Sequence, residues 1–215
     1  MNTLKSNTEI PKFKLIFLGD QGTGKSSILN RFIDDKFSED YQVTIGLDFQ
    51  SKNIKIDEQD VHLLLYDTAG QEKFRSLIPM YTRDANIILL VYDISRKDSF
   101  VHIPQWVKDL TNVKFDEVIF ALIGNKIDLQ EKRQVSIEEG KKYAEENNFL
   151  FAEVSAKTGD GIPELFYSKI FEGIRNKFRP GGQTIQPEIK DIGNVKIGED
   201  NNKTNNEKKK CCGGN

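Results

Sequence analysis

The feature that most constrains this chain is a glycine-rich loop that follows a short apolar run. The run Phe13–Leu18 has the length and composition of a buried strand, and the next residues fit the pattern G-x-x-x-x-G-K-[ST]. The loop consists of Gly19, Asp20, Gln21, Gly22, Thr23, Gly24, Lys25 and Ser26, with Ser27 next in the chain. Such glycines let backbone N–H groups surround phosphates, and the following helix directs its positive end at them. The loop therefore predicts a nucleoside triphosphate site, and it leaves the base and the reaction open.

Two side chains of this loop carry chemistry. Lys25 can reach the β- and γ-phosphates, and the Ser26 hydroxyl can ligate Mg²⁺. The alternative is a chance glycine turn ahead of a helix, which the strand before the loop and the helix after it make improbable.

Residues 13–178 alternate apolar runs with amphipathic stretches of helical length. We expect strands at Phe13–Leu18, Ile45–Ile56, Val61–Tyr66, Ile87–Tyr92, Val118–Ile123 and Phe149–Val154. We expect helices at Gly24–Asp34, Gln71–Arg83, Lys97–Asn112, Ser136–Asn147 and Gly161–Lys177, the fourth with a Ser136/Glu139 capping box. This alternation predicts one α/β domain with a six-stranded, mostly parallel sheet and helices on both faces. Ligands of such sheets bind beyond the carboxyl ends of the strands.

A second phosphate-facing loop follows the run Val61–Tyr66. It reads Asp67, Thr68, Ala69, Gly70, Gln71 and Glu72. Asp67 is placed to hold Mg²⁺ through water, the Gly70 N–H to meet the γ-phosphate, and Gln71 to orient the attacking water as the catalytic residue. An Asp after a strand can also be a helix cap, but its place behind a phosphate loop favours the metal.

Two later strand ends predict which base is bound. The polar residues that follow them are Asn125, Lys126 and Asp128 after one strand, and Ser155, Ala156 and Lys157 after the next. Asp128 can accept paired N–H bonds from guanine, a donor pair that adenine lacks. The Asn125 amide and the Ala156 backbone can read the opposite edge of guanine, and the two lysine stems can flank the base. Either pattern alone would be an ordinary loop; their joint placement predicts guanine.

Charge and composition exclude some classes of protein. The chain has 31 Lys and Arg residues against 33 Asp and Glu residues, so we expect no nucleic-acid partner. The polar start, with Asn2 at the second position, predicts neither a secretory signal nor N-myristoylation. No stretch approaches the roughly 18 apolar residues of a membrane span. The only two cysteines, Cys211 and Cys212, form no disulfide framework, which favours the cytosol.

The two ends of the chain differ from the middle. We expect residues 1–12 to be a flexible N-terminus and residues 179–215 to be a disordered tail, because the tail has no aromatic residue and little apolar surface to bury. The tail ends in three lysines, Cys211, Cys212 and three further residues. A solvated basic end, a vicinal disulfide and a metal pair are the plain alternatives, and the cytosol and the lack of further ligands disfavour the last two.

With its phosphate, Asp67–Glu72, Asn125–Asp128 and Ser155–Lys157 motifs in this order, the chain resembles the Ras-superfamily small GTPases over residues 13–178. The segments Ile45–Phe49, Lys73–Leu77 and Val91–Ser95 resemble those of Rabs. The segments Tyr41–Gly46, Phe74–Pro79 and Lys132–Gly140 resemble those of the sixth Rab subfamily, which serves Golgi and retrograde traffic.

This resemblance implies further site residues. Thr44 matches a switch threonine that ligates Mg²⁺ and touches the γ-phosphate. Phe37 matches an aromatic residue that lies against guanine, and Tyr41 matches one that closes over the phosphates. From sequence alone, Phe37 reads better as a core residue. The switches would be Phe37–Gly46 and Asp67–Thr82, ordered by the γ-phosphate. The implied effector-binding residues are Ile45, Gly46, Phe49, Tyr66 and Tyr81, and core packing is the alternative for the three aromatic ones.

The resemblance also implies partners and a location. It assigns GTP and GDP with Mg²⁺ as ligands, effectors that bind the GTP form, an exchange factor, a GTPase-activating protein, a prenylation escort and a GDP-dissociation inhibitor. Cys211 and Cys212 resemble a Rab prenylation signal, and two lipid chains give stable anchoring. We therefore expect a protein on the cytoplasmic face of intracellular membranes, at the Golgi, that cycles with the cytosol.

Two departures from the family pattern bear on function. Tyr66 stands where Rabs commonly have Trp, which alters the effector surface. Gln21 stands where many Ras-like proteins have Gly, and its longer side chain can hinder water alignment. The sixth Rab subfamily also carries Gln at this position, which supports the resemblance to that subfamily. We expect slow intrinsic hydrolysis. A GTP-binding scaffold with negligible hydrolysis stays open as the alternative, and a metabolite kinase shares only the phosphate loop.

Overall fold

The computed structural model describes residues 10–40, 42–111 and 113–177. Its six strands form one sheet in the order β2-β3-β1-β4-β5-β6. The strands are β1 (Lys12–Leu18), β2 (Leu47–Ile56), β3 (Gln59–Thr68), β4 (Ile87–Asp93), β5 (Ile119–Asn125) and β6 (Leu150–Val154). Only the β2–β3 pair is antiparallel. The predicted fold, a single α/β domain with a six-stranded, mostly parallel sheet, is confirmed.

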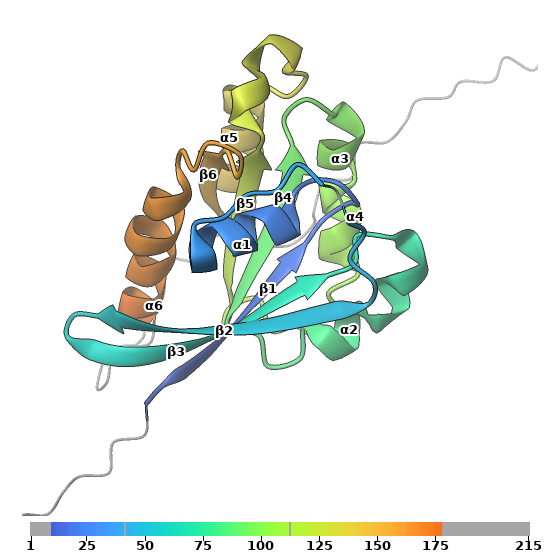
Figure 1. Cartoon of the computed structure of the whole chain (residues 1–215). Coiled ribbons are helices and arrows are strands. Elements are labelled where there is room, and N and C mark those ends of the chain that lie inside the picture. Colours follow the sequence, from blue (N-terminus) through green and yellow to red (C-terminus); the bar gives the residue numbers. More distant parts are fainter. Residues whose placement is uncertain (1–9, 41, 112, 178–215) are drawn as a thin grey trace, which may run out of the picture. The chain divides into compact units, whose positions relative to one another are not determined.

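The helices lie around the sheet, as Figure 1 shows. They are α1 (Lys25–Asp34), η1 (Glu72–Leu77), α2 (Ile78–Tyr81), α3 (Lys97–Val101), α4 (Ile103–Lys108), η2 (Ile127–Lys132), α5 (Ile137–Glu146), η3 (Glu164–Ile170) and α6 (Phe171–Lys177). The last two form one continuous helical stretch whose first part is π-helical.

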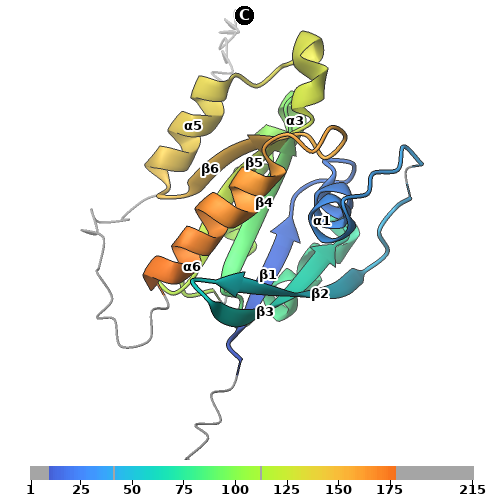
Figure 2. The same ribbon diagram turned by 60° about the vertical axis from the view of Figure 1, so that its left-hand side comes forward.

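Alternate residues of the central strands enter two separate cores. Leu15, Phe17, Leu89 and Val91 face α1, η3 and α6, whereas Ile16, Leu18, Ile88 and Leu90 face α2, α3, α4 and α5. In Figure 2, α1 and α6 lie on the same side of the sheet. Because both faces of β4 and β5 are buried, every residue of these strands is apolar or fully packed, as a central parallel strand requires.

Two predicted helices are interrupted. Lys97–Asn112 divides at His102 into α3 and α4, and Pro104 lies in the first turn of the second helix. The segment predicted as Gln71–Arg83 consists of the 3₁₀ helix η1 and the single turn α2, with Pro79 near its start. Proline has no backbone N–H to donate, so it is accommodated only at the start of a helix. Both predictions of one regular helix were therefore wrong in detail.

The remaining elements follow their predicted positions within a few residues. Ser136 caps α5 by accepting a bond from the Glu139 backbone N–H at 3.1 Å, but the Glu139 carboxylate contacts Lys97 and does not complete the capping box. Within the described residues, no helix combines the length and apolar character that a membrane crossing needs. The predicted N-terminal segment and the C-terminal tail lie almost entirely outside the described residues.

Candidate nucleotide site

A cavity of about 810 Å³ opens at the carboxyl ends of β1, β3 and β5, bordered by the loop between α1 and β2. Its volume suits a small molecule of nucleotide size. The predicted site residues that line it are Gln21, Gly22, Gly24, Lys25, Ser26, Ser27, Phe37, Thr44, Ile45, Asp67, Gly70, Asn125, Lys126, Asp128, Ala156 and Lys157. Segments from five parts of the chain thus meet at one place, as the sheet topology predicts.

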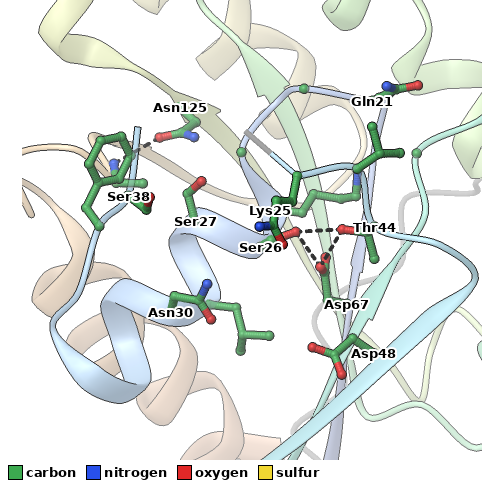
Figure 3. Close-up of a pocket in the computed structure, with 18 of the residues that line it drawn as sticks. Gln21, Lys25, Ser26, Ser27, Asn30, Ser38, Thr44, Asp48, Asp67 and Asn125 are labelled. Atoms are coloured by element: carbon green, nitrogen blue, oxygen red, sulfur yellow. Dashed lines mark hydrogen bonds between the residues drawn. The ribbon is translucent and has the colours of Figure 1, made fainter. Parts of the chain in front are cut away.

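Three oxygen-bearing side chains converge on the floor of the cavity (Figure 3). The Ser26 hydroxyl donates to Asp67 Oδ2 at 2.5 Å, Thr44 Oγ1 donates to the same oxygen at 3.1 Å, and the two hydroxyl oxygens lie 2.9 Å apart. Asp67 is buried, and its Oδ1 atom has no hydrogen-bond partner among the described residues. Burial raises the pKa of Asp67, while the bond from Ser26 and the Lys25 charge oppose that rise.

This cluster fits Mg²⁺. Two hydroxyls and a carboxylate are hard oxygen donors, the type that Mg²⁺ prefers. A buried carboxylate oxygen without a partner costs free energy until a donor or a cation satisfies it. The residues predicted as metal ligands are therefore together and have unused capacity to bind a cation.

Lys25 is the buried cation of the phosphate loop. Its Nζ donates to the carbonyl oxygens of Gly19 and Asp20 at 2.8 and 3.0 Å. Burial lowers the pKa of Lys25 to about 8, although Asp67 and Asp20 act in the opposite direction. The two carbonyl oxygens hold the ammonium beside the cavity. A phosphate can replace them, because a charged acceptor binds an ammonium more strongly than a neutral carbonyl does.

The backbone of this loop needs glycine at its end. Gly24 adopts φ +92°, a left-handed conformation, directly before α1 begins at Lys25. A Cβ at Gly24 would lie 2.2 Å from Asn125 Nδ2. Gly70 is equally constrained by space, because a Cβ there would lie 2.4 Å from Gln21 N, and Gln21 N donates to the Gly70 carbonyl at 2.9 Å. The loop after β3 is thereby pressed against the phosphate loop.

The predicted base-binding residues hold one another in place. Asn125 Nδ2 donates to Thr23 O at 2.8 Å, and Asn125 Oδ1 accepts from Ala156 N at 3.1 Å. Asn125 therefore ties three loops together and retains one free N–H for a ligand. The Ser155 hydroxyl donates to Asp128 Oδ1 at 2.6 Å, which leaves the other carboxylate oxygen for the paired donors of a base.

Lys126 is also fixed by a buried partner. Its Nζ lies 2.7 Å from Asp93 Oδ2 at the end of β4. Burial acts to raise the pKa of Asp93, but bonds from Lys126 and Ser95 outweigh it and hold that pKa below its ordinary value. Lys126 thus lines the cavity with its ammonium fixed, and its contact with a base stays a prediction.

Residues 14–175 match the Ras family. The chain belongs to the Ras family. Its members are small GTPases that bind GTP and GDP with Mg²⁺ and switch between the two nucleotide states. The four motifs found in the sequence and the cavity they form agree with this membership.

Four predicted residues of this Ras-family site lie behind the cavity wall. Gly19, Asp20, Thr23 and Ser155 do not line the cavity but bond to residues that do. The Asp20 carboxylate in particular turns away, to Trp106 Nε1 at 2.8 Å and His102 Nδ1 at 2.7 Å. The predicted part of Asp20 in nucleotide binding therefore falls to its backbone, whose carbonyl accepts from Lys25 Nζ, and it stays a prediction.

The predicted catalytic residue, Gln71, is half-buried and directly follows Gly70, but it does not line the cavity. It adopts an extended backbone conformation ahead of η1, and its carbonyl accepts from Phe74 N. Its catalytic role stays a prediction.

The predicted switch and effector residues are largely on the surface. Ile45 is 82% exposed and Phe49 52% exposed, and the Phe49 ring lies 5.1 Å from the half-buried ring of Tyr66. Tyr66 also packs against the core, so both of its predicted roles are compatible with its position. Phe37 likewise lines the cavity and packs on the core. Tyr41 lies outside the described residues, as do Cys211 and Cys212.

Sequence reasoning missed one basic and one acidic residue of the site, Arg31 and Glu39. Arg31 of α1 donates to the carbonyls of Ala156 and Lys157, at 3.0 and 2.8 Å. Glu39 pairs with Lys157 across the mouth of the cavity at 2.8 Å. These contacts join residues more than 100 positions apart, so no local pattern reveals them.

Proposed function

We propose that this protein is a Rab-type GTPase switch that is anchored to intracellular membranes, recruits effectors in its GTP form and serves vesicle traffic at the Golgi. The observation that carries the guanine-nucleotide part is the convergence of the phosphate loop, Asp67, Asn125, Asp128 and Ala156 on one cavity. The Rab and Golgi parts rest on the sequence segments described above, and the anchor rests on the two terminal cysteines.

The residues of the site suggest how GTP is held. Lys25 exchanges its two carbonyl partners for the β- and γ-phosphates, and Asp128 accepts the paired N–H donors of guanine. Ser26, Thr44 and Asp67 hold Mg²⁺, which when bound neutralises charge on the phosphate oxygens. Because Thr44 belongs to the loop between α1 and β2, the conformation of that loop depends on what occupies the γ-phosphate position.

Hydrolysis then needs one ordered water. The Gln71 side chain, with both donor and acceptor groups, orients this water opposite the leaving β-phosphate. Water attacks the γ-phosphorus, the bond to the β-phosphate oxygen breaks, and GDP and inorganic phosphate leave. Gln21 lies on the cavity wall against Gly70, next to Gln71, so we expect it to slow the alignment of the water.

The test is single-turnover hydrolysis by the purified full-length protein, loaded with radiolabelled GTP, with Mg²⁺ or with a chelator, and with ATP as the control nucleotide. We expect slow release of phosphate from GTP alone, and only with Mg²⁺. Tight binding of ATP in place of GTP would contradict the proposal.

Two variants separate the switch from its alternative. Gln71→Leu should reduce turnover by about 10²-fold, the loss typical of a misplaced reactant, while Gln59→Leu, at the opposite end of β3, should not change it. GTP binding without turnover in the wild-type protein would favour the scaffold, and Gln21→Gly should then restore hydrolysis.

A further inference from the structure

Trp106 of α4 is buried and bonds to the phosphate loop. It is 1% exposed, and its Nε1 donates to Asp20 Oδ1 at 2.8 Å. His102, one turn earlier, places Nδ1 2.7 Å from the other oxygen of the same carboxylate. An ionised carboxylate only accepts hydrogen bonds, so both rings donate to Asp20. The start of α4 therefore holds this residue of the phosphate loop from both of its oxygens.

The position of Asp20 affects Lys25, which lines the cavity, because the two residues are hydrogen-bonded. Its backbone carbonyl accepts from Lys25 Nζ at 3.0 Å and from Thr23 Oγ1 at 2.9 Å. A displacement of Asp20 relative to α4 therefore moves the carbonyl oxygen that binds the ammonium of Lys25. A series of hydrogen bonds thus connects Trp106 through Asp20 to Lys25.

The ring of Trp106 also contacts the segment that follows Gln71. The guanidinium carbon of Arg75, in η1, lies 4.7 Å from the ring centroid, a cation–π distance. Arg75 Nε lies 3.8 Å from Asp109 Oδ2, and both atoms are buried without a hydrogen bond to any residue that the structure describes. Since this ion pair is longer than a hydrogen bond, η1 is attached to α4 by contacts that can rearrange at little cost.

We propose that Trp106 is a positioning residue that couples the phosphate loop to η1 and thereby sets the relative affinity of the site for GDP and GTP. The proposal rests on the proposed function as a nucleotide switch. When η1 changes conformation with the nucleotide, Arg75 changes its contact with the ring, and the bond to Asp20 transmits the change to the phosphate loop. Coupling of this kind is reciprocal, so a change at Trp106 alters both the segment and the nucleotide preference.

The chain offers a direct readout, because Trp106 is its only tryptophan. We compare the tryptophan emission of the full-length protein loaded with unlabelled GDP and with a non-hydrolysable GTP analogue, both with Mg²⁺. The emission should differ between the two forms, and Arg75→Gln should remove most of the difference. Identical spectra for the two forms of the wild-type protein would overturn the proposal.

A second measurement separates coupling from a merely structural role. We compare the dissociation rates of fluorescent GDP and of a fluorescent GTP analogue from Trp106→Phe, which keeps a ring under Arg75 and removes the donor to Asp20. The ratio of the two rates should change by about tenfold, the size expected for a lost bond to a charged group. An equal change in both rates would overturn the coupling.

The matched control is Tyr92→Phe, which removes a buried hydroxyl from the same core cluster without contact to Asp20 or Arg75. It should leave the ratio unchanged. If neither nucleotide binds to the wild-type protein, the proposed function fails; if both bind but the emission and the ratio do not respond, only the role of Trp106 fails. The wild-type and Arg75→Gln spectra decide the question even if Trp106→Phe does not fold.

Discussion

At the scale of single residues, the carboxylate of Asp67 carries the most information about the site. One of its oxygens binds two hydroxyls, and the other is buried with no partner among the described residues. Such an arrangement costs free energy, on the order of 1–3 kcal/mol for an unsatisfied buried group. A bound cation relieves this cost, and so the ligand, the metal and the loop that carries Thr44 stabilise one another.

Removal of the metal should therefore release the nucleotide. We expect a chelator to accelerate the release of fluorescent GDP by at least about tenfold, the factor for the loss of about 1.4 kcal/mol, as measured by stopped flow. In Asp67→Asn the response to chelator should be much smaller, because this change weakens the metal site itself. Asp60→Asn alters an exposed carboxylate near the start of β3, away from the cavity, and it should respond like the wild type.

Asp128 allows a test of the base. Asp128→Asn presents an amide N–H where guanine has a donor, so GTP should lose at least about 10²-fold in affinity and xanthosine triphosphate should gain. Competition against fluorescent GDP measures both changes. An unchanged preference for guanine would contradict the assignment of the base to this carboxylate.

At the scale of elements, capping residues and prolines determine where helices begin and end, whatever the nucleotide site contains. Ser136 accepts from the backbone N–H of Glu139, which otherwise has no partner in the first turn of α5. Pro79 and Pro104, by contrast, divide longer amphipathic stretches into the short elements η1, α2, α3 and α4. Short elements are held mainly by tertiary contacts, which suits a segment that must rearrange.

The cap of α5 makes a stability prediction at this scale. Ser136→Ala should lower the free energy of unfolding by about 1 kcal/mol, because the loss of a side-chain cap leaves an N–H group without its partner. Urea unfolding of the GDP-loaded protein measures this change. GTP hydrolysis should not change, since α5 packs on the face of the sheet behind β5 and lines no part of the cavity. A loss of hydrolysis without a loss of stability would contradict this separation.

At the scale of the whole molecule, the sheet separates two cores and brings the ends of its central strands to one edge. The phosphate loop follows β1, Asp67 is the next-to-last residue of β3, which runs parallel to β1, and Asn125 ends β5. Both faces of β1 and β5 are packed, so the loops at their ends rest on a rigid support. The switch segments are then free to move against a fixed site.

The membrane anchor is tested at this scale too. If the proposed anchor is correct, replacement of both Cys211 and Cys212 by Ser should move the protein from the membrane fraction to the cytosol, because the proposal assigns stable anchoring to two lipid chains on these cysteines. Cell fractionation measures the distribution, and GTP binding by the variant controls for its fold. Persistent residence on membranes would mean that another part of the protein provides the anchor.

The sequence by itself determined the strands, the order of the motifs and most of the residues that line the cavity. The reason is local: the Gly19–Ser26 pattern, the alternation of apolar runs and the polar residues after strands each depend on neighbours in the chain. Parallel topology then dictates that the carboxyl ends of these strands meet at one edge. Membership of the Ras family agrees with that reading.

Only the tertiary structure decided how the side chains pair. The Asp20 carboxylate faces Trp106, 86 positions away, and Asn125 bonds to Thr23, 102 positions away. The sequence shows that a carboxylate such as that of Asp20, or an amide such as that of Asn125, needs a hydrogen-bond partner when it is buried. It does not show which of several possible partners lies near. Distant pairing is set by the packing of α4 and β5 against the phosphate loop, which is why Asp20 leaves the cavity and Asn125 ties its walls together.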